Sequence, residues 1–313
     1  MSRISADQPR KAFDANGIQF AWDATSIELA QACPRKYYYS MIEGWSPKSA
    51  SVHLIFDGHY ARALETFAKL RATGLSYDDA VLEVVGQTLL ETWDREKNEP
   101  VQFDHATKTR FTLLRSIVWY LEEFRDDNME TYLLADGTPA VELSFAIEID
   151  ETLVLTGHLD KVVKHEDSLF VMDQKTTGST ITPKFFSDFS PHNQMSLYSF
   201  AGKAVLQSPV RGVIIDGAQI AAGFTRFERG FVRRTPDQLE EWFYSTRVTI
   251  DNIRLYSEAA DRGAAAFPMN LASCGNYGGC SFRSVCSRSP SVRQNFLEAD
   301  FTRESWWDPL SAR

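Results

Sequence analysis

The stretch GHLDKVVKHEDSLFVMDQKTTGS, residues 157–179, decides the fold that we expect, together with QMSLY at 194–198. Residues 152–163 and 169–175 are rich in valine, leucine and threonine, and the polar run 164–168 separates them. This pattern predicts two antiparallel strands joined by a turn. The polar residues of these strands are therefore candidate active-site residues.

Two carboxylates and a lysine share one region of the expected hairpin. Successive side chains of a strand point to opposite faces, so Asp173 and Lys175 share a face while Gln174 points the other way. Asp160, near the end of the partner strand, can come alongside Asp173. Neighbouring carboxylates repel unless a cation lies between them, and oxygen ligands suit Mg²⁺ or Mn²⁺. Such an ion could activate water at a phosphodiester while Lys175 stabilises the developing negative charge.

A helix predicted over residues 192–206 carries Gln194 and Tyr198, which are four residues apart and therefore share one face. Each feature alone has an ordinary explanation, because an Asp-x-Lys on a surface strand is usually a solvated ion pair. The order of the features along a predicted strand, strand and helix favours a joint functional interpretation.

These motifs resemble those of the PD-(D/E)XK nuclease superfamily, in its RecB-like branch, which includes CRISPR-associated adaptation nucleases and many phage proteins. The resemblance implies that Asp160, Asp173 and Lys175 are catalytic and that the two aspartates bind Mg²⁺ or Mn²⁺. It also implies that Gln194 and Tyr198 position DNA. The motifs that carry it are Gly157-His158-Leu159-Asp160, Asp173-Gln174-Lys175 and Gln194-x-x-x-Tyr198.

The chain as a whole is expected to adopt an α/β fold with a restriction-endonuclease-like core, a mixed central sheet flanked by helices, and a helical insertion. We expect residues 1–313 to form a single nuclease domain, with a helical lobe over 57–130 and a catalytic sheet core over 141–234. Besides the hairpin and the helix 192–206, the expected elements are a short helix beginning at Thr25, helices over 57–72, 76–97 and 105–125, strands over 141–149, 210–220 and 225–234, and a helix from Thr235-Pro236 to about 261.

The composition is that of an ordinary globular protein, with 43% hydrophobic and 24% charged residues. We expect a cytoplasmic protein without a membrane partner, because no run could span a bilayer and the polar N-terminus lacks a signal-peptide core. A formal net charge of −9 argues against a uniformly basic surface for DNA. A local basic track would suffice, and the candidates for it are Arg226, Arg229, Arg233, Arg234, Arg283 and Arg288.

Four cysteines form a second pattern. Cys33 stands near the N-terminus, and Cys274, Cys280 and Cys286 follow at six-residue steps. Buried thiols, a zinc site and an iron–sulfur cluster are the alternatives, since disulfides are not expected in a cytoplasmic protein. The close Cys-x-x-Cys pairs typical of zinc sites are missing. The pattern resembles the [4Fe–4S] staple of the iron–sulfur branch of the same superfamily, although the first step of the trio is wider here. The resemblance implies a cluster that ties the chain ends together and takes no part in hydrolysis.

The expected metal site departs from the superfamily at one position. Relatives commonly carry a metal-binding histidine on the first core helix, and an alignment on Phe56, Leu64 and Glu65 puts Ala61 there. His59 lies two residues earlier, which turns its side chain by about 200° away on a helix. We predict that Glu65, which shares the face of Ala61, approaches the metal. His59 is the alternative if it precedes the helix.

We therefore expect a metal-dependent DNA nuclease, acting as an exonuclease on DNA ends or single strands in recombination or repair, in a phage setting and with other recombination or replication proteins as partners. The alternative is a catalytically inactive DNA-binding or scaffold protein of the same fold, which the missing histidine favours. Glu142, on the preceding strand, is an accessory ligand or an exposed glutamate. Trp306 and Trp307 pack on the core or contact a partner.

Overall fold

The structure is a computed structural model that describes residues 12–49, 51–206, 208–303 and 308–310, so Trp306 and Trp307 lie outside it. The chain divides into two compact units. The terminal unit consists of the segments Met1–Ser49, Ala146–Gly157 and Thr235–Ala312. The sheet unit consists essentially of Ala50–Phe145 and His158–Arg234.

A mixed sheet forms the centre of the fold, which confirms the expected α/β class. Its strands follow the order β1-β7-β8-β9-β10, and β5 and β6 also pair with β7. β7 and β8 are antiparallel, β8 and β9 are parallel, and β9 and β10 are antiparallel. The bounds are β1 Ala21–Trp22, β5 Glu130–Thr131, β6 Val141–Asp150, β7 Leu153–His165, β8 Ser168–Thr177, β9 Val210–Ile220 and β10 Thr225–Val232.

The predicted hairpin is present with a two-residue turn. His165 pairs with Ser168 and Lys161 pairs with Met172 across the two strands. The turn residue Glu166 has φ 53°, in the left-handed region that short hairpin turns require. Because the turn fixes the register, one further step along the ladder sets Asp160 opposite Asp173.

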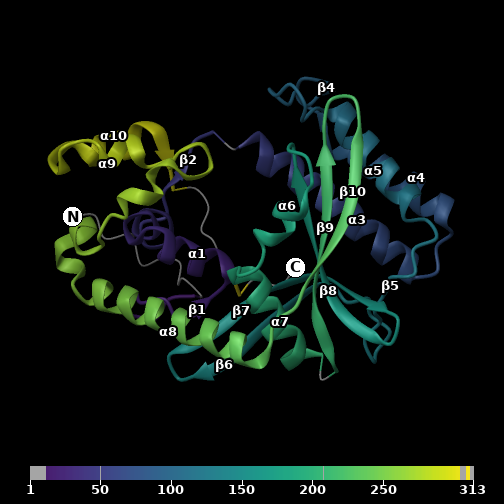
Figure 1. The fold of residues 1–313 in the computed structure, drawn as a ribbon. Helices are drawn as coiled ribbons and strands as arrows, with labels where there is room; N and C mark the ends of the chain where they lie inside the picture. The colour runs from purple at the N-terminus through teal and green to yellow at the C-terminus, as the bar shows by residue number, and fades with distance from the viewer. Residues whose placement is uncertain (1–11, 50, 207, 304–307, 311–313) are drawn as a thin grey trace. The chain divides into compact units, whose positions relative to one another are not determined.

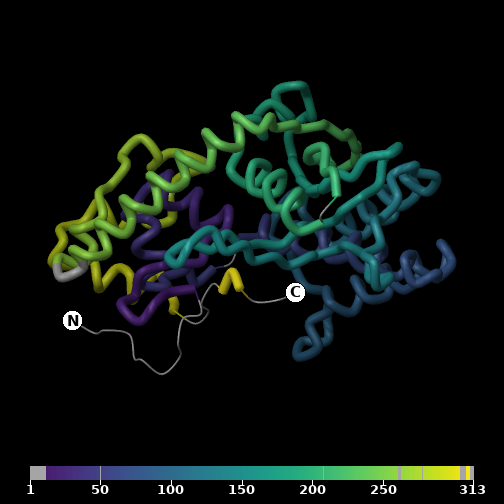
Figure 2. The backbone as a smooth tube through the Cα atoms, turned by 90° about the horizontal axis from the view of Figure 1, so that it is seen from below, coloured from purple at the N-terminus to yellow at the C-terminus, as the bar shows by residue number. Residues whose placement is uncertain are grey.

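Helices cover both faces of the sheet within the sheet unit (Figure 1). α7 (Asn193–Val205) packs on one face, where a Cβ added to Gly202 would lie 3.2 Å from Val210 and 3.3 Å from Val171. The other face carries α3 (Val52–Ala72), α4 (Tyr77–Glu91) and α5 (Arg110–Glu123), which lie beside one another in Figure 2. Their common core with β9 contains Phe56, Tyr60, Ala63, Leu64, Val84, Leu113, Ile117, Tyr120, Leu121, Ala218 and Ile220.

Helices α3, α4 and α5 occupy the segment expected to form the helical lobe, but the second of them is shorter than predicted. The helix expected over 76–97 ends at Glu91, and Thr92 caps it. Two short strands then pair with each other, β3 (Trp93–Asp94) and β4 (Glu99–Pro100). The polar run between them folds back locally instead of continuing the helix, since Asp94 accepts the backbone N–H groups of residues 96 and 97. On the other side of the sheet, the short helix α6 (Pro183–Ser187) lies between β8 and α7 along the chain.

The terminal unit is mostly helical. Its longest helix, α8 (Pro236–Glu258), begins with the predicted Thr235 cap, which forms a capping box with Gln238. α1 spans Ala24–Ala32. Its N-cap is Asp23, two residues before Thr25, where the helix was expected to begin. The remaining elements are α2 Pro34–Tyr37, a π-helix Tyr38–Ile42, α9 Arg283–Cys286, α10 Arg293–Asp300, 3-10 helices at Ala260–Ala266, Leu271–Gly278 and Pro290–Val292, and the paired strands β2 Ser46–Pro47 and β11 Phe301–Thr302.

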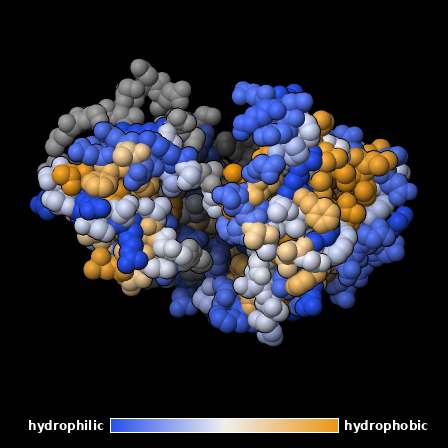
Figure 3. Space-filling model, turned by 90° about the horizontal axis from the view of Figure 1, so that it is seen from above, coloured by the Kyte–Doolittle hydropathy of each residue, from blue (hydrophilic) through white to orange (hydrophobic). Residues whose placement is uncertain are grey.

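The surface of the described residues is mixed in character. Hydrophilic side chains are interrupted by apolar ones on the face seen in Figure 3. On the outer sides of α4 and α5, Leu82 and Phe111 expose 71% and 69% of their area. None of the described helices combines the length and the apolar character that crossing a membrane requires.

Candidate active site

The hairpin brings two carboxylates together on the face of the sheet that α7 covers. Asp173 on β8 is fully buried, and Asp160 on β7 is half-buried. Asp173 Oδ2 forms an ion pair with Lys175 Nζ at 2.6 Å, whereas its Oδ1 accepts no hydrogen bond from the described residues. Asp160 Oδ2 accepts a hydrogen bond from the backbone N–H of Gln174 at 3.4 Å. One buried carboxylate oxygen is thus left for a ligand that the protein does not supply.

The electrostatics of the pair favour a bound proton or cation. Burial and, next, the neighbouring Asp173 carboxylate raise the pKa of Asp160 to about 7. Burial also raises the pKa of Asp173, and the charge of Lys175 opposes this effect. Ionising both of two carboxylates that share a buried space costs much free energy unless a cation is present. The pair therefore suits a divalent metal ion near neutral pH.

A chain of hydrogen bonds connects the two carboxylates through α7. Lys175 Nζ donates to Gln194 Oε1 at 2.9 Å, and Gln194 Nε2 donates to the Tyr198 hydroxyl at 3.0 Å. The Tyr198 hydroxyl in turn donates to Asp160 Oδ1 at 3.2 Å. Burial raises the pKa of Tyr198 well above its usual value, so the hydroxyl keeps its proton and remains a donor. All five residues predicted from the hairpin and helix motifs are therefore brought together.

Glu65 and His59, the two candidates for a third metal ligand, do not lie beside the carboxylates of Asp160 and Asp173. Glu65 forms an ion pair with Lys69 one turn along α3, and His59 Nδ1 lies 3.2 Å from Glu91 Oε2 on α4. The physical reason is that α3 covers the opposite face of the sheet from Asp173 and its partners. In residues 12–303, apart from the gaps at 50 and 207, no three His, Cys, Asp or Glu side chains form a group that could hold a metal.

Glu142, the accessory candidate, lies near the start of β6. It is half-buried, and its φ of 51° is unusual for a residue other than glycine. It therefore departs from regular strand geometry. Its role as a ligand stays a prediction.

One arginine of the expected basic track is not at the surface. Arg229 Nε lies 3.0 Å from Asp216 Oδ1, and its Nη1 lies 2.6 Å from Asp127 Oδ2. Its guanidinium carbon also lies 3.7 Å from the centre of the Phe124 ring. This cluster on the α5 side of the sheet makes Arg229 structural, whereas Arg226 and Arg233 are exposed. Sequence reasoning missed the cluster because its members come from three separate segments: β9, β10 and the loop after α5.

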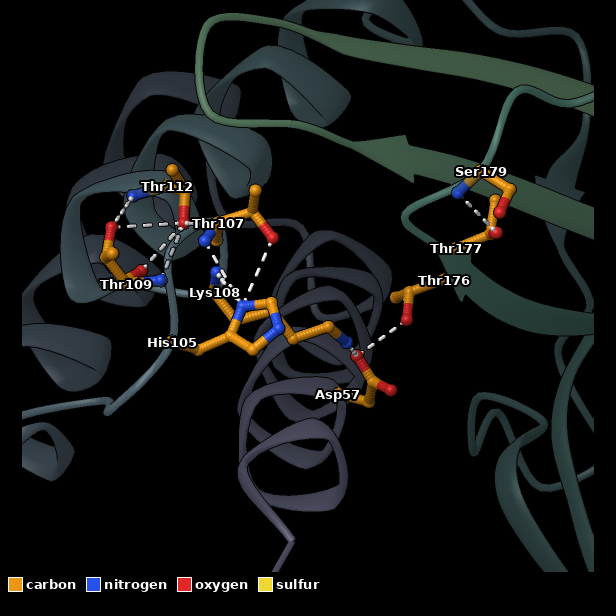
Figure 4. A network of polar contacts seen from close by, with 9 residues as sticks. All are labelled: Asp57, His105, Thr107, Lys108, Thr109, Thr112, Thr176, Thr177 and Ser179. Carbon is orange, nitrogen blue, oxygen red and sulfur yellow. Dashed lines mark hydrogen bonds and ion pairs between the residues drawn. The ribbon is translucent and has the colours of Figure 1, made fainter. Parts of the chain in front are cut away.

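Three further polar residues near the site were not predicted. Thr176, next to Lys175 on β8, donates its hydroxyl to Asp57 Oδ1 at 2.6 Å. Asp57 also pairs with the buried Lys108 (Figure 4). Asp57 and Lys108 are 51 positions apart in sequence, so no local pattern connects them.

The tertiary structure gathers the four cysteines within the terminal unit, all as free, half-buried thiols. Cys33 Sγ accepts the backbone N–H of Asn270 at 3.4 Å, and Cys274 Sγ lies 3.9 Å from the carbonyl oxygen of the same residue. The backbone N–H of Cys280 donates to the carbonyl of Cys274 at 3.0 Å. Burial raises the pKa of the Cys286 thiol, and the nearby Cys280 and Cys33 contribute to the increase. The donor set has the chemistry of a metal or cluster site, although the described sulfur atoms are not assembled into a metal-holding group.

A buried arginine lies among these thiols. The Arg35 side chain is 6% exposed, its Nε donates to the carbonyl of Phe267 at 2.9 Å, and its Nη1 has no partner among the described residues. Its positive charge, like that of Arg293, opposes the rise of the Cys286 pKa. A buried cation near the Cys286 thiol fits a site that carries negative charge.

The fold and the hairpin motifs together define a family of nucleases. The model of the PD-(D/E)XK nuclease superfamily matches residues 21–287, which is most of the chain. The chain therefore belongs to the PD-(D/E)XK nuclease superfamily, as its motifs predicted. Nucleases of this superfamily generally use Mg²⁺ or Mn²⁺.

A comparison with solved structures finds a crystal structure described as that of a candidate exonuclease from Eubacterium rectale. The two chains are 10% identical, with a TM-score of 0.48 over 83% of this chain and 88% of that chain. A search of the curated proteins finds none that matches this chain.

Proposed function

We propose that this protein is a metal-dependent nuclease that hydrolyses DNA phosphodiester bonds at the Asp160–Asp173–Lys175 site. The observation that carries the proposal is the chain of contacts from Asp173 through Lys175, Gln194 and Tyr198 to Asp160. In it, one oxygen of the fully buried Asp173 carboxylate has no donor among the described residues. A purely structural ion pair would not need to bury a second, mutually repelling carboxylate beside it.

In this proposal each side chain has one task. Asp160 and Asp173 hold Mg²⁺ or Mn²⁺, which supplies charge stabilisation and a bound water of lowered pKa. Lys175 stabilises the negative charge that develops on the phosphate. Gln194 fixes Lys175, and Tyr198 fixes Asp160, through the hydrogen bonds described above. The same two residues then face the strand of DNA that enters the site.

We further propose that the nuclease is an exonuclease that acts on DNA ends or single strands in recombination or repair. It would do so in a phage setting, together with other recombination or replication proteins. Support comes from superfamily membership and from the resemblance of the motifs to the RecB-like branch. The negative charge of the chain restricts the DNA contacts to local patches, such as the exposed Arg226 and Arg233.

The test is cleavage of end-labelled single- and double-stranded DNA, with Mg²⁺, Mn²⁺ or a chelator. We expect cleavage only with metal, and loss of at least about 100-fold in Asp173→Asn and Lys175→Met because each removes stabilisation of the transition state. Asp167→Asn, an exposed change on the same hairpin, serves as the control and should cleave like the wild type. DNA binding without cleavage under any metal would instead support the inactive scaffold.

We also propose that Cys33, Cys274, Cys280 and Cys286 hold a [4Fe–4S] cluster that connects the two ends of the chain. Support comes from the contacts of Cys33 and Cys274 with Asn270, from the proximity of Cys280 and Cys33 to Cys286, and from the buried Arg35 near Cys286. Anaerobically purified protein should be brown, and Cys286→Ser should lose both iron and thermal stability, since a structural metal site contributes to folding. Colourless protein with stoichiometric zinc would contradict the iron–sulfur assignment.

A further inference from the structure

The second polar network beside the candidate active site lies on the face of the sheet away from the carboxylates. Asp57, near the start of α3, accepts the hydroxyl hydrogen bond of Thr176 through Oδ1. The same oxygen pairs with the ammonium group of Lys108, which is only 5% exposed. Figure 4 shows the aspartate between the two donors, with one donor on the end of β8 and the other on the segment before α5.

Lys108 is held in place by the segment that carries it. His105 Nδ1 accepts the backbone N–H of Lys108 at 3.0 Å and that of Thr107 at 3.2 Å. The Lys108 ammonium also lies 4.9 Å from the centre of the Phe56 ring. The next residue, Thr109, caps α5 through a capping box. The lysine therefore approaches Asp57 from a fixed backbone, which makes the position of the carboxylate well defined.

The end of β8 needs such support. In the described pairing, β7 accompanies β8 only as far as Met172, whereas β9 continues to pair with Lys175, Thr176 and Thr177. The part of the strand that carries Lys175 is therefore held by ladder hydrogen bonds on one side. Side chains alternate, so Thr176 reaches α3 on one face while Lys175 reaches Gln194 on the other.

We propose that Asp57 is a positioning residue for Lys175. With its charge balanced by Lys108, its carboxylate holds the Thr176 hydroxyl and thereby fixes the last residues of β8. The ammonium of Lys175 is then kept at the place where phosphate charge develops. The inference rests on the proposed function, since it gives Lys175 a role in hydrolysis. It assigns to α3 a contribution to catalysis that requires no contact with metal or DNA.

A pair of substitutions at one position tests the proposal. Thr176→Val removes the hydroxyl at nearly constant shape, and Thr176→Ser keeps it. We expect Thr176→Val to lower kcat roughly 10-fold with KM for DNA unchanged, because small misplacements of a catalytic group have effects of this size or larger. Thr176→Ser should return kcat to within about twofold of the wild type. Thermal unfolding of each variant shows whether the fold is kept.

The double variant Asp57→Ala with Lys108→Met provides a second measurement. It removes both charges together, so no buried lysine is left unpaired. We expect the same loss of kcat as in Thr176→Val, and no additional loss when the three changes are combined, because all act through one interaction. Additive losses, wild-type kcat in Thr176→Val, or failure of Thr176→Ser to restore it would overturn the inference. The proposed function fails separately, if wild-type protein does not cleave or if Lys175→Met cleaves normally.

Discussion

Replacing Asp160 by asparagine should stabilise the metal-free protein at alkaline pH. In the wild type, Asp160 lies beside Asp173 in a largely buried site, and its pKa is raised to about 7 by burial and by the neighbouring carboxylate. Asparagine keeps the shape of the side chain but carries no charge, and its single carbonyl oxygen can accept from Gln174 or from Tyr198 but not from both. The substitution therefore removes the repulsion between the two carboxylates, at the cost of the site's affinity for metal.

The magnitude follows from the difference between the folded pKa of about 7 and the ordinary value of 3.8. Each pKa unit corresponds to about 1.4 kcal/mol, so the wild type should lose up to about 4 kcal/mol of stability as Asp160 ionises. The sign is fixed by linkage. A raised carboxyl pKa favours the folded state fully below pH 3.8, and this contribution is lost as the pH rises through 7, because the unfolded chain has already released the proton.

The assay is urea unfolding at pH 4.5, 6, 7 and 8 in a metal chelator. We expect the free energies of unfolding of wild type and Asp160→Asn to be closest at pH 4.5, where about 1 kcal/mol of the difference remains, and to differ by a few kcal/mol at pH 8, with the variant more stable. Adding Mg²⁺ at about 100 times its Kd should restore about 2.7 kcal/mol to the wild type alone. Asp167→Asn, on the same hairpin but exposed, should follow the wild type throughout. Equal pH dependence in wild type and Asp160→Asn would refute the reasoning.

Three other predictions concern residues around the site. Tyr198→Phe should lower kcat about 10-fold without unfolding the protein, since it removes only the hydroxyl that bonds to Asp160; unchanged cleavage kinetics would remove Tyr198 from the site. Glu65→Ala and His59→Ala should both keep metal-dependent cleavage within about twofold, because their partners lie on α3 and α4, and a large loss in either would return that residue to the metal site. Gly230→Ala should cost about 1–3 kcal/mol in urea unfolding, since its Cβ would lie 2.1 Å from the Phe186 ring; wild-type stability would mean that the ring moves freely.

The local patterns of the sequence were enough to predict the hairpin and its partners. Alternation with period two correctly placed Asp173 and Lys175 on one face, and helical spacing correctly put Gln194 and Tyr198 together. The Thr235 cap was equally visible in sequence. These features depend on residues within a few positions of one another, where backbone geometry leaves few alternatives.

Contacts between distant segments could not be predicted in this way. The helical spacing of Glu65 relative to Ala61 was sound, but it could not show that α3 packs on the opposite face of the sheet from Asp173. The same holds for Arg229, whose burial depends on carboxylates from β9 and from the loop after α5.

The sequence by itself therefore determined the two strands of the hairpin, the helix that faces them and the superfamily. The tertiary structure alone decided which residues of α3 reach the sheet, because helix packing is set by the whole apolar core and not by one motif. It is this packing that brings Asp57 to Thr176 and Lys108. The spacing of residues within a helix or strand shows which of them share a face. Only the packing of the whole core decides which other segments that face contacts.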